Sequence, residues 1–279
     1  MTFVWDTVAP ILAPVTPVPT PTNDTTPSYT FNVDKAGWLV GSTGTINITG
    51  SCGAWDLVAV LNGDNTVTFT GPLAETTYAD CGIVVTDFAG NPGVALEIND
   101  FEVDTTPAVP TTITTEDTDF DGKVDSATIV FDDPVDDSTF TPGDFSIDSV
   151  AADGFDTDGG VDNATVILTW SAGVDGTEAK TLVYGSTAID LAGNSIATFS
   201  TLATDAAKPV MLSARTVSTT LIEAMFSEDL NGATVNGSGD EFTVSGQIVS
   251  AATENGADDG RVDVVVDAMP TDATPDVTY

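Results

Sequence analysis

A short motif that occurs twice constrains the fold of this chain more than any other feature. Residues 87–91 read Asp-Phe-Ala-Gly-Asn, and residues 190–194 read Asp-Leu-Ala-Gly-Asn. Each copy is followed by a boundary sequence, Asp-Thr-Thr-Pro at 104–107 and Asp-Ala-Ala-Lys-Pro at 205–209, and the related Asp-Thr-Val-Ala-Pro stands at 6–10. Pro and Asp in such links stop strands and stiffen junctions. A period of about 100 residues with this punctuation predicts domains in tandem.

The boundaries divide the chain into three expected domains. We expect a first domain over 1–104 that opens with a Pro/Thr-rich lead strand, a second over 105–205 and a third over 206–279. Leu-Val-Tyr at 182–184 matches Val-Thr-Tyr at 277–279. The repeated motif begins six residues after Tyr184, whereas the sequence stops at Tyr279. The third domain is therefore expected to be C-terminally truncated. Either the chain is a piece of a longer polypeptide, or another chain fills the missing edge.

Within each domain, short alternating apolar and polar runs are separated by Gly, Asn and Asp. Examples are residues 127–131, 164–170 and 261–266. Runs spaced at roughly 8 to 12 residues with such turns predict antiparallel β-sandwiches, and no long stretch shows helical periodicity. The expected fold class is all-β, with tandem sandwiches of which the third is incomplete.

The charge of the chain excludes several classes of function. Lys and Arg number 6 against 43 Asp and Glu, which gives a formal net charge of −37, and His is absent. Such a surface repels nucleic acids and anionic membranes, and no apolar run reaches the ~20 residues that cross a bilayer. Without His, triads of the Ser-His-Asp type and most zinc sites are excluded. Sites that bind hard cations such as Ca²⁺ through oxygen ligands are not excluded by this composition.

The clearest candidate for such chemistry is the run 117–125, Asp-Thr-Asp-Phe-Asp-Gly-Lys-Val-Asp. Alternate carboxylates around a Gly are typical of a Ca²⁺-binding loop, because the Gly permits the turn that brings them onto one ion. Thr128 stands where an EF-hand has its bidentate Glu, so a calcium turn between two strands fits better than an EF-hand. The candidate ligands are Asp117, Asp119, Asp121 and Asp125.

Two weaker copies of this pattern share the core Asp-Gly-Xaa-Val-Asp or a close variant. Their candidate ligands are Asp156, Asp158 and Asp162 in one copy, and Asp259 and Asp263 in the other. For all three runs the alternative is a plain Asp-Gly hairpin turn with solvated acids. The strong net charge favours bound cations, because self-repulsion destabilises the compact state unless clustered carboxylates are neutralised. Adaptation to high salt would explain the acidity without calcium.

Acidic residues also gather at the expected joints between domains. Asn91 and Asn194 lie in the repeated turns, close to four further candidate metal ligands: Asp87, Asp104, Asp190 and Asp205. Loop and linker carboxylates of adjoining domains could share an ion. The alternative is that each Asp caps its own turn while Asn adopts the left-handed conformation.

The two cysteines, Cys52 and Cys81, both fall in the first domain. In an exported β-domain they most simply form one disulfide, and two buried free thiols are the alternative. Possible N-glycosylation triplets begin at Asn23, Asn47, Asn163 and Asn236, although such triplets arise often by chance in a Thr-rich chain.

The order and spacing of these segments resemble a known family. Residues 6–10, the Pro/Thr-rich run 15–27 and the segment 78–91 look like the Ig-like repeats of large prokaryotic surface proteins. Domains two and three resemble the Ig-like domains of S-layer proteins, through Phe-Asp-Asp-Pro at 131–134 or Phe-Ser-Glu-Asp at 226–229. The resemblance implies an Ig-like fold, an extracellular place in the S-layer or cell wall, and a role in surface architecture.

These observations predict a structural cell-surface protein, an S-layer-type array subunit or a fragment of one, with calcium as its ion. The expected partners are copies of itself or further domains of the same longer chain. The alternative function is a calcium-rigidified stalk or extender region of a surface adhesin. A third possibility is a module that binds surface glycans. We expect no enzyme, because no cleft-forming insertion interrupts the repeats and chance carboxylate pairs are unavoidable among 43 acids.

Overall fold

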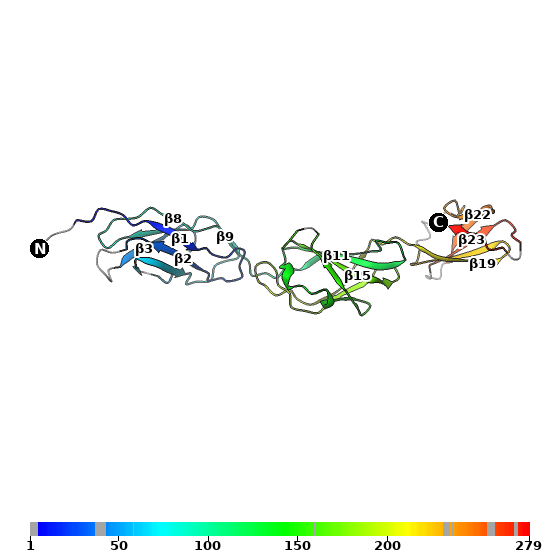
Figure 1. The fold of residues 1–279 in the computed structure, drawn as a ribbon, viewed down its shortest axis with the longest axis horizontal. Coiled ribbons are helices and arrows are strands. Elements are labelled where there is room, and N and C mark those ends of the chain that lie inside the picture. The colour runs from blue at the N-terminus through cyan, green and yellow to red at the C-terminus, as the bar shows by residue number, and fades with distance from the viewer. Residues whose placement is uncertain are drawn as a thin grey trace. The chain divides into compact units, whose positions relative to one another are not determined.

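The computed structural model describes residues 5–36, 43–57, 59–158, 160–230, 235, 237–255, 260–270 and 273–279. Over these residues the chain consists of β-strands and loops, with two 3₁₀ turns, Asp137–Thr139 and Pro142–Asp144, and no α-helix (Figure 1). The all-β prediction is confirmed. The chain forms two compact bodies: Met1–Pro107 with Ile189–Ser195, and Ala108–Ala188 with Ile196–Tyr279.

The first body has three antiparallel sheets around one hydrophobic core. Their orders are β1-β2-β5, β4-β3-β7-β8 and β6-β9. Buried aromatic residues fill the space between the sheets, with the Trp55 and Phe69 rings 4.1 Å apart. The strands are β1 Leu12–Thr16, β2 Ser28–Val33, β3 Gly44–Thr49, β4 Ala59–Val60, β5 Gly63–Thr68, β6 Thr76–Tyr78, β7 Gly82–Thr86, β8 Leu96–Glu97 and β9 Phe101–Val103.

The first sandwich of the second body has sheets of five and four strands, ordered β14-β15-β11-β10-β18 and β13-β12-β16-β17. Its core is built on Trp170, whose indole donates to the backbone oxygen of Val150 at 3.0 Å. The strands are β10 Pro110–Glu116, β11 Lys123–Phe131, β12 Phe145–Ile147, β13 Val150–Ala151, β14 Gly154–Asp156, β15 Thr165–Asp175, β16 Thr181–Tyr184, β17 Phe199–Leu202 and β18 Thr204–Asp205.

One strand pair in this sandwich differs from the antiparallel expectation. Strand β18 runs parallel to β10, with Thr204 beside Thr114 and Asp205 beside Thr115. The reason is topological: after β17 closes the four-stranded sheet, the chain crosses to the other sheet and arrives next to its first strand.

The last sandwich has its own core and sheets ordered β19-β20-β23-β22 and β21-β24. Strands β21 and β24 correspond to β12 and β16, because Phe-Thr-Val at 242–244 matches Phe-Ser-Ile at 145–147 and each set precedes a matching Tyr strand. The smaller sheet thus has two strands among the described residues, against four in its counterpart. The strands are β19 Met211–Ser218, β20 Leu221–Phe226, β21 Thr243–Val244, β22 Val249–Glu254, β23 Arg261–Val266 and β24 Val277–Thr278.

Candidate functional site

The acidic turn 117–122 joins strands β10 and β11, and its conformation follows from its sequence. The two strands are paired antiparallel up to Glu116 and Ser126. Phe120 has φ 61° and Gly122 has φ 88°, so the chain reverses through two left-handed residues. Asp side chains accept hydrogen bonds from backbone N–H groups two to five residues on, which is the usual way that Asp stabilises a turn.

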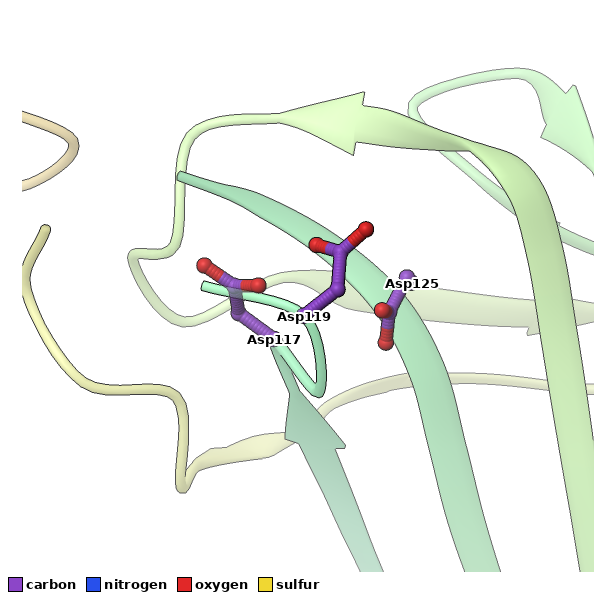
Figure 2. A group of neighbouring side chains, drawn as sticks. All are labelled: Asp117, Asp119 and Asp125. Atoms are coloured by element: carbon purple, nitrogen blue, oxygen red, sulfur yellow. The ribbon is translucent and has the colours of Figure 1, made fainter. Parts of the chain in front are cut away.

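Three carboxylates of this turn converge. Asp117, Asp119 and Asp125 each offer one oxygen, and these oxygens all lie within 4.8 Å of one another. Figure 2 shows Asp117 and Asp119 on the turn and Asp125 on the adjoining strand β11. Asp117 is buried, Asp119 is exposed and Asp125 is half-buried. Like charges so close repel one another, and a divalent cation among them would relieve this repulsion.

Hydrogen bonds hold two of these carboxylates in place. Asp117 Oδ2 accepts from the N–H of Gly122 at 2.8 Å, and Asp125 Oδ2 accepts from the hydroxyl of Thr118 at 2.6 Å. Asp121, the fourth ligand expected from the sequence, is not part of this group. Its Oδ1 accepts a hydrogen bond from the N–H of Lys123 at 3.0 Å. The donor set is made of hard carboxylate oxygens, which fits Ca²⁺ and does not suit a soft metal.

An open groove of about 480 Å³ runs beside the turn and gives solvent access to it. Its lining includes Asp119, Asp121 and Asp125, together with Thr169 and Ser171 of β15. A cation that used three protein carboxylates could therefore complete its coordination with water.

The second acidic run is arranged differently. Asp156 Oδ1 accepts from the N–H of Asp158 at 2.8 Å, within its own turn. Asp162 instead faces Asp137, and the Asp162 N–H donates to Asp137 Oδ2 at 2.7 Å. Burial, with the charges of Asp162 and Asp136, raises the pKa of Asp137. The sequence analysis missed Asp137, because its partner lies 25 residues away.

In the third run, Asp263 on β23 lies 3.5 Å from the guanidinium Nε of Arg261. Asp259 lies outside the described residues. Among the described residues, the acidic turn is the one place where three candidate ligands meet.

The four joint aspartates each cap a turn. Asp87 and Asp190 accept from the N–H of Asn91 at 2.9 Å and of Asn194 at 2.8 Å. In the same way Asp104 accepts from Thr106 and Asp205 from Ala207. The Asp caps agree with the alternative considered from the sequence, but the left-handed residues of the repeated turns are Gly90 and Gly193, with φ 92° and 95°, and not the Asn residues. An ion at the joints stays a prediction.

Charge at the Asp87 turn is partly neutralised. Lys35 Nζ lies 3.1 Å from Asp87 Oδ2 and 2.8 Å from Asp6 Oδ2. Burial acts to raise the pKa of Asp87, but hydrogen bonds from Asn91 and Lys35 outweigh it and lower this pKa to about 2. Asp87 is therefore ionised at any physiological pH.

Glu228 is a further acidic residue that sequence reasoning missed. Burial, a hydrogen bond with Asp205 and the charge of Asp205 raise the pKa of Glu228 to about 7. The hydroxyls of Thr177 and Ser227 meet beside it at 2.7 Å. Glu228 and Asp205 are separated by two strands in the sequence, so no local motif signals their approach.

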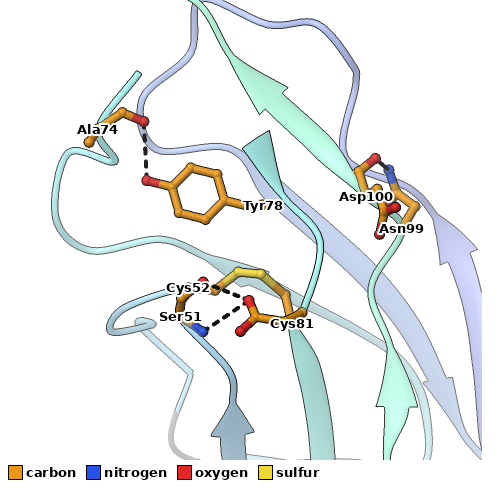
Figure 3. Close-up of a disulfide and its surroundings, with 8 residues drawn as sticks. Ser51, Cys52, Ala74, Tyr78, Cys81, Asn99 and Asp100 are labelled. Atoms are coloured by element: carbon orange, nitrogen blue, oxygen red, sulfur yellow. Dashed lines mark hydrogen bonds between the residues drawn. A yellow bond between two sulfur atoms is a disulfide. The ribbon is translucent and has the colours of Figure 1, made fainter. Parts of the chain in front are cut away.

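Cys52 and Cys81 form a disulfide in the first body, with their Cα atoms 5.6 Å apart (Figure 3). Next to it, Asp80 Oδ1 accepts from the Ser51 hydroxyl at 2.6 Å. Both sulfur-bearing residues are buried in the core.

The glycosylation triplets differ in accessibility. Asn23 and Asn47 are exposed, whereas the half-buried Asn163 amide donates to the backbone oxygens of Thr157 and Gly160. Asn236 lies outside the described residues. A helix long and apolar enough to cross a membrane is not found in the described part of the chain.

Comparisons with known proteins give no family. No protein-family model matches the chain, and no curated protein matches it. One similar solved structure is a Bacteroides ovatus protein, SGBP-B of the mixed-linkage glucan utilization locus, in complex with a mixed-linkage heptasaccharide. The identity is 14%, the TM-score is 0.23, and the match covers 98% of this chain but 64% of that one. A likeness this low carries no argument about fold or function.

Proposed function

We propose that this chain is a structural protein of the cell surface, an S-layer-type array subunit or a fragment of one, built from calcium-stabilised sandwiches that associate with copies of themselves. The observation that carries the proposal is the group formed by Asp117, Asp119 and Asp125 at the tip of a hairpin, in a chain that contains several similar sandwiches. Repeated sandwiches supply length and surface, and a bound cation would stiffen a loop that is otherwise self-repelling.

The net charge supports this assignment. A chain at −37 gains more from bound divalent cations than a neutral one, and the hard oxygen ligands of the turn suit the calcium of an extracellular environment. The disulfide between Cys52 and Cys81 fits the same oxidising compartment.

Calcium dependence is tested by thermal unfolding of the 279-residue chain at low salt, with calcium and with chelator. At 100 times the dissociation constant, binding stabilises by about 3 kcal/mol, which corresponds to a rise of roughly 10 °C for one sandwich. The double variant Asp119→Asn/Asp125→Asn should lose this rise. The control Asp121→Asn changes a neighbouring carboxylate outside the group and should keep it.

The same measurement separates calcium binding from adaptation to salt. A wild-type melting temperature that is equal with calcium and with chelator would remove calcium from the proposal. Imaging of the native surface then tests the role: a repeating sheet supports an array, whereas isolated fibres support the stalk of an adhesin.

A further inference from the structure

The two sandwiches of the second body meet at a polar junction. Ser227 and Glu228 directly follow β20 of the last sandwich. They contact Thr177 and Asp205 of the preceding sandwich. The hydroxyl oxygens of Ser227 and Thr177 are 2.7 Å apart, and Ser227 Oγ accepts a hydrogen bond from the backbone N–H of Val210 at 2.9 Å. Side chains from both sandwiches therefore build this junction.

Hydrogen bonds at the junction are directed toward Glu228. Because Ser227 Oγ accepts from Val210, the proton of the Ser227 hydroxyl can be donated to Thr177. The Thr177 hydroxyl in turn donates to the Glu228 carboxylate, and Thr177 is 0% exposed. This row of hydrogen bonds begins at the backbone, so it fixes the position of the Glu228 side chain.

Glu228 and Asp205 bring two carboxyl groups into contact without a basic partner. Neither residue forms an ion pair with a Lys or Arg in the described part of the chain. Burial raises the pKa of Glu228, and the hydrogen bond with Asp205 and the charges of Asp205 and Glu178 act in the same direction. Two carboxylates in contact repel one another unless a proton or a cation lies between them. Once both groups are ionised, a cation is needed in that place.

Two oxygens at this junction are buried and have no hydrogen-bond partner: Glu228 Oε1 and Thr115 Oγ1. Thr115 is 0% exposed and lies directly beside Asp205 in the parallel pairing of β10 with β18. Side chains of such paired residues project from the same face of the sheet, so the Thr115 hydroxyl and the Asp205 carboxylate share a face. Buried oxygens without a partner are unfavourable and therefore point to a ligand.

The charge of the junction indicates which ligand this is. A water molecule could pair with the Thr115 hydroxyl, but it would not offset the charges of Asp205 and Glu228. We propose that Asp205, Glu228 and Thr115 bind a calcium ion between the two sandwiches of the second body. Two carboxylates and one hydroxyl supply hard oxygen ligands, and water completes the coordination.

This inference rests on the proposed function and deepens it, because it adds a calcium site that joins consecutive sandwiches. Thr115 and Asp205 come from β10 and β18 of one sandwich, while Glu228 comes from the other. Affinity for calcium rises with the number of charged ligands, so a site with two carboxylates binds more weakly than the acidic turn with three. We expect a dissociation constant on the order of 1 mM, as in other extracellular modules.

Calcium binding at the junction is tested by calorimetric titration of the 279-residue chain to millimolar calcium at constant ionic strength. The titration uses the double variant Asp119→Asn/Asp125→Asn, which removes two carboxylates of the acidic turn. We expect this variant still to bind calcium, and the addition of Glu228→Gln to weaken binding by at least about tenfold. Asp229→Asn changes the adjacent exposed residue and, added instead, should leave the affinity unchanged. Absence of binding in the double variant, or equal affinity with Glu228→Gln and with Asp229→Asn, overturns the proposal.

Thr115→Val tests the buried hydroxyl, because Val has nearly the shape of Thr. With chelator, this change added to the double variant should leave the melting temperature equal or higher, since it removes an unpaired buried hydroxyl. With saturating calcium it should lower the melting temperature, since a ligand is lost. A hydroxyl that serves only packing would have the same effect under both conditions, and that result overturns the proposal.

Failure of the junction site can be told apart from failure of the proposed function. Calcium binding that requires Asp119 and Asp125 but not Glu228 removes the junction site and leaves calcium at the acidic turn. Binding that requires Glu228 but not Asp119 or Asp125 supports the junction site and removes the acidic turn from the proposed function. Binding in two phases, each lost with its own ligands, supports both.

Discussion

The side-chain amide of Asn194 donates a hydrogen bond to the backbone oxygen of Asp104 at 3.1 Å, across 90 residues of sequence. The same amide donates to Asp190 Oδ2 at 3.1 Å, and Asp190 is 1% exposed. The last residue of the repeated motif therefore links two segments by hydrogen bonds: the turn 190–194 and the boundary segment that begins at Asp104. A buried carboxylate depends on this amide for one of its partners.

Replacement of this amide should be costly. We expect Asn194→Ala to lower the free energy of unfolding by about 1 to 3 kcal/mol, because it leaves the Asp190 carboxylate short of a donor and the Asp104 oxygen unbound. Calorimetry measures the effect. Asn47→Ala, at an exposed residue of β3, is the control and should change stability little. Equal melting of Asn194→Ala and the wild type would contradict this account of the motif.

A second prediction concerns pH. Burial, with a hydrogen bond that the protonated Glu228 carboxyl donates to Asp205 and with the charge of Asp205, raises the pKa of Glu228 to about 7 from a usual 4.5, so the folded protein holds a proton that the unfolded chain releases. A raised carboxyl pKa contributes stability that is present at low pH and is lost as the pH rises from about 4.5 through about 7. We expect stability to fall over this window by on the order of 1 to 3 kcal/mol.

The matched variant isolates this contribution. Glu228→Gln keeps the size of the side chain and cannot ionise, so its stability should be flatter between pH 4.5 and 7 than that of the wild type. Chemical unfolding at several pH values, in buffer with chelator, gives the two curves. Parallel curves over this window would show that Glu228 does not titrate there.

Part of the candidate site was predictable because its ligands are close in sequence. Asp117, Asp119 and Asp125 fall within one hairpin, so alternation and one Gly were enough to indicate that they converge. The pairs Asp137–Asp162 and Asp205–Glu228 could not be predicted, since each joins residues more than 20 positions apart in the sequence. Their approach depends on how strands are placed in sheets, and alternation alone does not carry that information.

The same distinction holds for the fold. The alternation of buried and exposed residues along β11 identifies a strand with one face in the core. The parallel pairing of β18 with β10 was not predicted, because a two-residue strand has no pattern of its own. It follows from the crossing of the chain between sheets.

The disulfide gives a prediction confined to the first body. Its closed loop spans 29 residues, and the loss of this constraint should lower stability by about 3 to 4 kcal/mol in the chain-entropy model. Cys52→Ser/Cys81→Ser should unfold at lower denaturant, followed through the fluorescence of Trp55, which packs on Phe69 in the same core. Reductant should shift the wild type toward this variant and leave the variant itself unchanged. A wild type insensitive to reductant at its unfolding midpoint would contradict the expectation.

The last prediction tests why Gly stands at residue 122. Gly122 has φ 88°, and an added Cβ would collide with the Leu212 side chain of β19. Gly90 has φ 92° with open space around it. Gly90→Ala should therefore cost about 1 kcal/mol from backbone strain alone, whereas Gly122→Ala should cost about 1 to 2 kcal/mol, because the end of the Leu212 side chain must also move aside.

Leu212 provides the matched test of the collision. It is 55% exposed, so Leu212→Ala by itself should cost little. The double variant Gly122→Ala/Leu212→Ala removes the obstructing side chain and should recover the part of the loss that exceeds the Gly90→Ala value, as seen in the coupling energy of a double-mutant cycle. Additive effects of the two substitutions would show that backbone conformation, and not the contact with Leu212, is what requires glycine at this position.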